Sequence, residues 1–190
     1  LDPHFTASLG SVKILNNIFN GLLKVAYDGK KVSFVPDLAE TWEMPDDKTH
    51  VFKLRKGVKF HNGDPCDAAA VKFSFERAAA KDSVNKDKAV FANIESIATP
   101  DAHTVTLTLK NPNPDLLFQL GQGTAIIVEP KSVATNVTQP VGTGPYRVQN
   151  WMKGSSLLSK RNVPDSPTEA SSASKSRTAT RTARFPTKPG

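Results

Sequence analysis

The stretch Thr104-Val105-Thr106-Leu107-Thr108-Leu109 alternates without a break and is the clearest strand signal in the sequence. Because successive side chains of a strand point to opposite faces, this alternation predicts a β-strand with one apolar face. The preceding Pro100-Asp101 is typical turn chemistry, and residues 95–99 lead into it. The stretch therefore predicts the second half of a β-hairpin.

The same pattern occurs 55 residues earlier in the chain. Residues 40–46 match residues 95–101 without a gap, and Phe52 then falls on Leu107, as Leu54 falls on Leu109. Equal spacing of the apolar residues predicts two hairpins that bury the same face. Side by side, they would form one antiparallel sheet. A solenoid is not implied, because a repeat architecture needs at least three units.

The remaining periodicity predicts a mixed α/β chain. Asp67 is a good N-cap for a helix over residues 68–80, and Ser11 for a helix that ends near Gly21. The hairpin of the earlier copy lies within residues 32–60. Weaker patterns predict the following elements: helices over 83–91 and 115–120, a short strand over 58–60, a buried strand over 125–128, and strands over 145–151 and around 157–158.

Charge is unevenly distributed along the chain. The 25 Lys and Arg residues against 18 Asp and Glu give a net charge of +7, with part of the excess in residues 163–190. In this final segment 14 of 28 residues are Ser, Thr or Pro, and no period survives, which predicts disorder. The segment also lacks the interleaved aromatic residues that stack on bases. We therefore expect no nucleic-acid partner.

Catalytic and metal-binding motifs are not found in the sequence. The histidines show no metal-ligand spacing, and no Gly-x-Ser-x-Gly elbow is present. His50 and His103 adjoin turns, which favours solvated surface histidines. The single Cys66 is interpreted as a half-buried structural residue rather than a reactive thiol. These observations predict no enzyme, no catalytic residue, no metal and no cofactor.

Gly142-Thr143-Gly144 could be mistaken for the start of a phosphate-binding loop. The third glycine and the following helix of such a loop are missing. Pro145 and the strand-like residues after it instead predict a tight crossing of the chain.

Several motifs together resemble one protein family. These are Leu1-Asp2-Pro3-His4, Pro36-Asp37-Leu38-Ala39-Glu40-Thr41-Trp42-Glu43, Phe52-Lys53-Leu54-Arg55-Lys56-Gly57-Val58-Lys59-Phe60-His61-Asn62-Gly63, Val71-Lys72-Phe73-Ser74-Phe75-Glu76-Arg77 and Pro140-Val141-Gly142-Thr143-Gly144-Pro145-Tyr146. In this order they resemble the solute-binding proteins of bacterial peptide-type ABC transporters, family 5.

The resemblance implies an α/β, periplasmic-binding-protein-like fold of type II. It extends over residues 1 to about 162, which would be the N-terminal third of such a protein. Residues 1–22 and 125–162 would form an incomplete first lobe, and residues 23–124 a smaller antiparallel lobe inserted into it. Residues 163–190 would be a disordered tail outside the family, and we expect that a frameshift or truncation produced it.

The implied function is capture of a peptide or related solute between lobes, for import through an ABC transporter permease. In peptide-binding members the segment after Asp-Pro-His pairs with the ligand backbone, and here that segment is Thr6, Ala7, Ser8 and Leu9. The loop Gln122, Gly123 and Thr124 should face the cleft between the lobes. A monomer, periplasmic or lipid-anchored outside the cytoplasmic membrane, is expected.

Two other functional classes stay open at this point. One is a fragment without binding activity, and the other is a sensory domain of a regulator that uses the same fold. The ligand class also stays open, because peptide, nickel-chelate, haem and oligosaccharide binders share these motifs.

Overall fold

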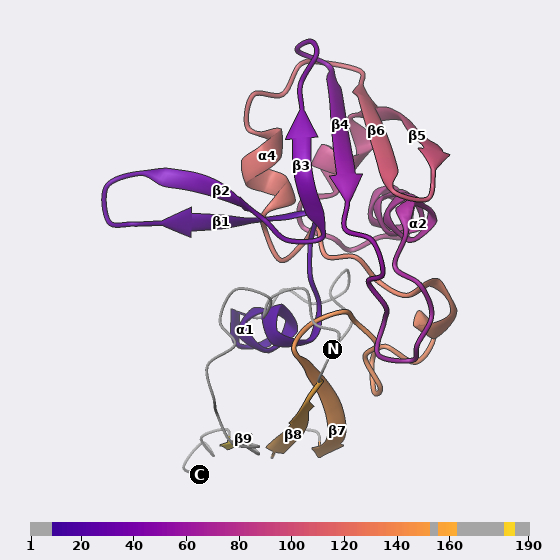
Figure 1. The fold of residues 1–190 in the computed structure, drawn as a ribbon. Helices are drawn as coiled ribbons and strands as arrows, with labels where there is room; N and C mark the ends of the chain where they lie inside the picture. The colour runs from indigo at the N-terminus through magenta and orange to yellow at the C-terminus, as the bar shows by residue number, and fades with distance from the viewer. Residues whose placement is uncertain (1–8, 153–155, 163–180, 185–190) are drawn as a thin grey trace.

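A four-stranded antiparallel sheet forms the centre of the larger half of the molecule (Figure 1). In this computed structural model, residues 9–152, 156–162 and 181–184 are described. The elements are α1 (Leu9–Ile18), β1 (Leu23–Tyr27), β2 (Val32–Pro36), β3 (Ala39–Glu43), β4 (Thr49–Leu54), α2 (Ala68–Ala79), α3 (Lys88–Ala92), β5 (Ile94–Asp101), β6 (Thr104–Leu109), α4 (Leu116–Leu120), the 3₁₀ turn η1 (Pro130–Ser132), β7 (Tyr146–Met152), β8 (Ser156–Arg161) and β9 (Arg181–Arg184).

The predicted pair of matching hairpins is confirmed. The strand order is β3-β4-β6-β5, so the two hairpins meet through their second strands. Val51 pairs with Thr106, its own counterpart at the 55-residue offset, which places a local twofold axis between these two residues. The predicted apolar positions are buried in both copies: Phe52, Leu54, Leu107 and Leu109.

The two hairpins also share their irregularities. A register shift between Ala39 and Thr41 recurs between Ile94 and Ser96. Their turns use the same device, since Asp46 accepts the N–H of Lys48 at 2.8 Å and Asp101 accepts that of His103 at 2.7 Å. The sequence match thus extends to bulge and turn geometry.

Helix α2 covers one face of this sheet. Asp67 caps it as predicted, accepting the N–H groups of Ala69 and Ala70 at 3.0 and 3.2 Å. Val71 and Phe75 are buried, and the Phe75 ring packs against Phe91 of α3 with centroids 5.3 Å apart. This core continues through the apolar residues of β3, β4, β6 and α4.

A second, smaller core lies between α1 and the sheet β7-β8-β9 (Figure 1). Its buried members are Leu15, Ile18, Phe19, Ile126, Val128 and Leu157. Ile126 and Val128 face this core, whereas Ala125 and Ile127 belong to the larger one. One extended segment therefore contributes to both cores.

Segment 125–128 is buried as predicted, but the predicted strand is wrong. The segment pairs with no strand of the described chain, because its N–H groups bond elsewhere. Ile127 donates to the carbonyl oxygen of Asn20 at 3.0 Å, and Val128 donates to Oγ of Ser74 at 2.9 Å. Burial alone produced the apolar run here.

Other boundaries also differ from prediction. Helix α1 begins at Leu9, so Ser11 is not its N-cap. Helix α3 begins at Lys88 rather than at residue 83, because Asn85 is used in a turn and accepts the N–H of Asp87 at 2.9 Å. Over 58–60 the structure has only one isolated bridge, between Lys59 and Pro65, in place of a strand.

The β1-β2 hairpin was not predicted. It projects from the body of the molecule (Figure 1), and its turn is held by Asp28, whose Oδ1 accepts the N–H groups of Lys30 and Lys31 at 2.9 and 2.8 Å. Gly29 has φ +94°, which favours glycine at this position. The sequence signal was Asp28-Gly29, a strong hairpin dipeptide.

Part of the segment expected to be disordered forms a strand. Arg181–Arg184 pairs antiparallel with β8 as β9, which departs from the expectation at these four residues. Without β9, β8 would be an outer strand of the sheet, and an outer strand offers unpaired backbone groups to any extended segment. Among the described residues, no helix has the length and apolar character needed to cross a membrane.

Candidate functional site

Two segments of chain cross between the two cores, and they lie side by side. The first covers residues 19–23 and the second residues 121–127. They are joined by the hydrogen bond from Ile127 to the Asn20 carbonyl oxygen, 3.0 Å long. These two crossings define the junction where a ligand could contact both halves of the molecule.

Asp37 is the centre of the polar contacts at this junction. Its carboxylate accepts hydrogen bonds from Nδ2 of Asn20 at 2.8 Å and from the N–H of Gly21 at 3.2 Å. It also forms an ion pair with Nζ of Lys24 at 3.0 Å. Asp37 is 3% exposed, so these partners replace the water it loses. Nε of Arg55 donates to its carbonyl oxygen at 2.6 Å.

This network extends to the second core through Asn20, whose Oδ1 accepts Oγ1 of the fully buried Thr143 at 3.0 Å. Burial raises the pKa of the Asp37 carboxyl above its usual value, and the charge and hydrogen bond of Lys24 oppose that shift only in part. Desolvation therefore outweighs the ion pair at this position.

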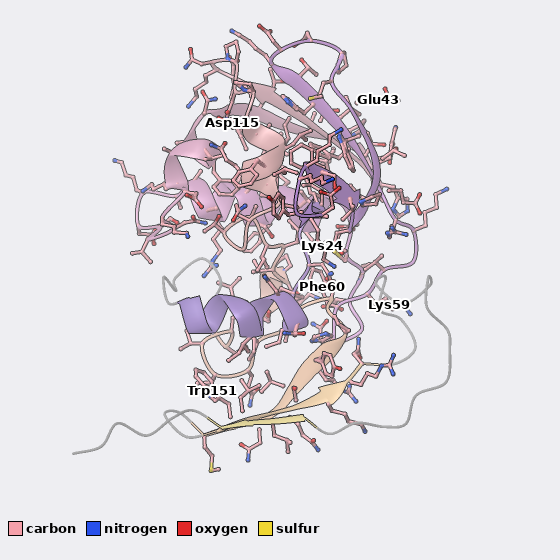
Figure 2. The ribbon with its side chains drawn as sticks, turned by 90° about the vertical axis from the view of Figure 1, so that its left-hand side faces the viewer. Lys24, Glu43, Lys59, Phe60, Asp115 and Trp151 are labelled. Carbon is pink, nitrogen blue, oxygen red and sulfur yellow. The ribbon has the colours of Figure 1, made fainter. Side chains whose placement is uncertain are left out.

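A cavity of about 300 Å³ lies beside Asp37 at the junction. It is lined from the first crossing by Phe19 and Gly21, from β1 by Lys24, and from the second crossing by Gln122. Figure 2 shows Lys24 at the level between the central sheet and α1. The lining combines apolar surface with an ammonium, a carboxylate and amides, which suits a small polar solute.

The structure describes only some of the predicted site residues, and it places them in α1 and in the loop at the junction. Thr6, Ala7 and Ser8 lie outside the described residues, and Leu9 is the first residue of α1. Gln122 lines the junction cavity, and Gly123 follows it in the same loop.

Thr124 is buried in the same loop and does not line the cavity. Its Oγ1 donates to Asp87 at 2.6 Å, and its carbonyl oxygen accepts Nδ2 of Asn85 at 2.9 Å. These contacts hold the loop against the larger core.

Sequence reasoning missed Asn20, Lys24 and Asp37. A usable signal was the place of Asp37 directly before Leu38 and Ala39, both buried. An acidic residue next to core positions requires a cation or several donors nearby. Which residues supply these groups follows only from the tertiary fold.

The Gly142-Thr143-Gly144 segment is a close crossing against α1, as its lack of a loop motif indicated. A Cβ on Gly142 would collide with the carbonyl oxygen of Ile18, and one on Gly144 would lie 2.6 Å from the carbonyl carbon. The Gly144 N–H donates to the Ile18 carbonyl oxygen at 2.8 Å. Only glycine allows this approach.

His61 holds this segment from the other side. Its Nε2 donates to the Gly144 carbonyl oxygen at 2.9 Å, and its Nδ1 accepts the Gly142 N–H at 3.4 Å, which requires a neutral ring. Burial lowers the pKa of His61, and the nearby Arg147 charge lowers it further, against the effect of the Gly144 hydrogen bond.

The surface interpretation is wrong for His50, which is 4% exposed. It lies two residues before Phe52 on β4, so both side chains point to the buried face of the strand. Burial lowers the pKa of His50. Cys66 is buried, and burial raises the pKa of its thiol to about 12, so it is a structural residue. Within the described part of the chain, no group of three or more potential ligands is placed to hold a metal ion.

The fold and the junction cavity define a periplasmic-binding-protein-like α/β protein. The family model for bacterial extracellular solute-binding proteins, family 5 (middle region), matches residues 33–164. The chain belongs to this family. At the level of the family, its members are binding proteins rather than enzymes.

Curated relatives carry names that describe binding. The glutathione-binding protein GsiB of Pectobacterium atrosepticum is 32% identical over 156 residues, which are 80% of this chain and 30% of that protein. The probable D,D-dipeptide-binding periplasmic protein DdpA of Escherichia coli K12 is 31% identical over 171 residues, which are 83% of this chain and 33% of that protein. The chain thus spans about a third of the length of these relatives.

Solved structures agree with the family. The binding protein MoaA of A. tumefaciens R10, in complex with mannopinic acid, superposes with a TM-score of 0.82 at 28% identity, over 97% of this chain and 38% of that one. The binding protein AgaA from the same source, in complex with agropinic acid, superposes with a TM-score of 0.77 at 31% identity, over 84% of this chain and 33% of that one.

Proposed function

We propose that this chain is the extracytoplasmic substrate-binding component of a peptide-type ABC importer, and that it captures a peptide or related solute between lobes. The observation that carries the proposal is family membership together with a polar cavity at the junction of two cores. Relatives named for glutathione and D,D-dipeptide binding support a small peptide-like ligand.

The proposed lobes follow the two cores. Residues 1–22 and 125–162 would form one lobe, and residues 23–124 the smaller one. The division is supported by the two core clusters, which meet at residues 19–23 and 121–127. Closure of two lobes over a ligand requires contacts that exist only in the closed state.

Within the proposed site, residues have different roles. The backbone of Thr6, Ala7, Ser8 and Leu9 would pair with an extended ligand. Gln122 would donate or accept a hydrogen bond through its amide, which is supported by its place in the cavity lining. Gly123 would keep the loop close to the ligand, and Thr124 would position it through the contact with Asp87.

The proposed partners follow from the function. A membrane permease would receive the ligand from the closed form, and the binding protein would act as a monomer outside the cytoplasm. No nucleic-acid partner is proposed.

A thermal unfolding scan of the chain tests this proposal. A millimolar mixture of di- and tripeptides should raise the unfolding midpoint, because a ligand that binds only the native state stabilises it. Gln122→Ala should reduce the shift. Asp47→Ala, a change at an exposed residue that lines neither this cavity nor the one bordered by residues 147–151, should leave it unchanged. A midpoint that no peptide moves would contradict the proposal and favour a fragment without binding activity.

A further inference from the structure

A second cavity, of about 470 Å³, lies in the smaller half of the molecule. It is bounded by residues 61–62, by residues 138–141 and by five consecutive residues of β7, 147–151. Since successive side chains of a strand alternate between faces, a groove lined by consecutive residues runs along the edge of that strand. The sheet order β7-β8-β9 makes β7 an outer strand in the described chain. We call this cavity the β7 groove.

One cationic side chain, that of Arg147, lines the β7 groove. Arg147 is exposed and lines it, and in the part of the chain that the structure describes the guanidinium makes no ion pair or hydrogen bond. On the neighbouring strand, Lys160 stands directly opposite Arg147 in the register. Like charges placed opposite each other on a sheet repel, and a bound anion would relieve that repulsion.

The rest of the lining offers hydrogen bonds without negative charge. Asn62, Gln139, Gln149 and Asn150 contribute amides, and no described residue of the lining is acidic. The nearest acidic residue in sequence, Asp64, is held by Nζ of Lys131 at 2.9 Å. A cation that is surrounded by amides and is not neutralised suits a carboxylate, which a guanidinium can bind through two parallel hydrogen bonds.

Trp151 gives the groove an aromatic side. It belongs to β7, is half-buried, lines the groove and packs on the core beneath α1 (Figure 2). Its indole would contact the apolar part of a ligand whose carboxylate lies on Arg147.

We propose that the β7 groove is a second binding site, distinct from the junction cavity, for a small carboxylate-bearing solute. An added peptide strand is disfavoured, because the pairing of β7 with β8 shifts register between Val148 and Asn150. Such a bulge bends the strand and interrupts the regular edge that an added strand needs. The volume also lies within the usual range for small-molecule sites, about 300–1,000 Å³.

Tryptophan fluorescence can test this site specifically, because the chain has two tryptophans and only Trp151 lines the groove. In a Trp42→Phe background, N-acetyl-L-glutamate is titrated into the full chain while Trp151 emission is followed. The neutral N-acetyl-L-glutaminamide serves as the matched probe without carboxylates. A saturable change with the acid and none with the amide is expected.

Three variants separate the guanidinium from general charge. Arg147→Gln should weaken binding at least about tenfold, the scale of losing charge-assisted hydrogen bonds. The affinity of Arg147→Lys should lie between those of the native chain and Arg147→Gln, because lysine keeps the charge but lacks the planar guanidinium that binds a carboxylate through two hydrogen bonds. Lys86→Gln removes the same charge at an exposed position outside the lining, and should change affinity by less than about twofold.

Each other outcome would overturn the proposal. These are no saturable change with the acid, equal binding of the amide, or equal weakening by Arg147→Gln and Lys86→Gln. Binding of a blocked, neutral pentapeptide of alternating threonine and valine, with no response to the acid, would instead assign the groove to an added strand. Arg147 is exposed, and an unchanged unfolding midpoint of Arg147→Gln would show that the variant folds.

Discussion

Replacing Asp37 by alanine tests whether the polar network at the junction stabilises the fold. The substitution leaves Nδ2 of the buried Asn20 and the N–H of Gly21 without their acceptor. An unsatisfied buried donor costs about 1–3 kcal/mol. The Lys24 side chain is 41% exposed and regains water, so its loss adds little. We expect Asp37→Ala to lower the free energy of unfolding by about 2–4 kcal/mol at pH 7.

Whether the stability cost of Asp37→Ala rises or falls with pH distinguishes desolvation of the carboxyl from its ion pair with Lys24. Burial raises the pKa of Asp37 above its usual value of 3.8, so between 3.8 and the raised value the folded chain holds a proton that the unfolded chain has released. Stability from Asp37 is therefore fully present below pH 3.8 and falls as pH rises through the folded pKa. The cost of Asp37→Ala should be larger at pH 4 than at pH 7.

Urea denaturation followed by circular dichroism measures both quantities. Asp47→Ala is the matched control, because Asp47 is exposed and its removal should stay within about 0.5 kcal/mol. A cost for Asp37→Ala no larger than that of the control would refute the network. A cost that grows with pH would show that the ion pair with Lys24, rather than desolvation, dominates.

Three further outcomes are expected. Gly142→Ala should prevent native folding or lower stability by at least about 3 kcal/mol, since its Cβ would meet backbone at Ile18; a midpoint in urea equal to that of the native chain would contradict this. Burial lowers the pKa of His61 below 6.5, so its stabilising effect is present above pH 6.5 and decreases as pH falls toward the folded value. The urea midpoint should thus fall less between pH 7 and 5 in His61→Gln than in the native chain. The thiol of Cys66, with a pKa of about 12, should not react with Ellman's reagent at pH 8 until urea is added, and rapid reaction of the native chain would argue against its burial.

The central sheet could be predicted from sequence because local patterns determine it. Strict alternation, a Pro-Asp turn and an exact spacing between copies together specified which strands pair and which face is buried. The same logic, applied fully, would have placed His50 in the core, since it lies two residues before Phe52 on β4. The β1-β2 hairpin could also have been predicted, because Asp28-Gly29 is a dipeptide typical of hairpin turns.

The junction could be predicted only in part. The family resemblance pointed to Gln122, which lines the cavity. The Asp37 network could not be predicted from the sequence, because Asn20 and Thr143 are separated by 123 residues and meet only in the folded chain. The β7 groove was hidden for a similar reason, since the edge of a sheet is known only once the strand order is known. Segment 125–128 reads as a strand from its apolar run, yet it serves two cores without pairing.

Solution NMR of the ¹⁵N-labelled chain, titrated with a di- and tripeptide mixture, tests the central claim most directly. If the chain captures peptides at the junction, saturable shifts should appear at the side-chain amide of Gln122 and the backbone N–H of Leu9. The side-chain amide of Asn111, which is exposed and lies outside both the junction cavity and the β7 groove, should stay unshifted. Spectra that do not change at millimolar peptide, or shifts that avoid the junction, would contradict the assignment of this chain as a peptide-binding protein.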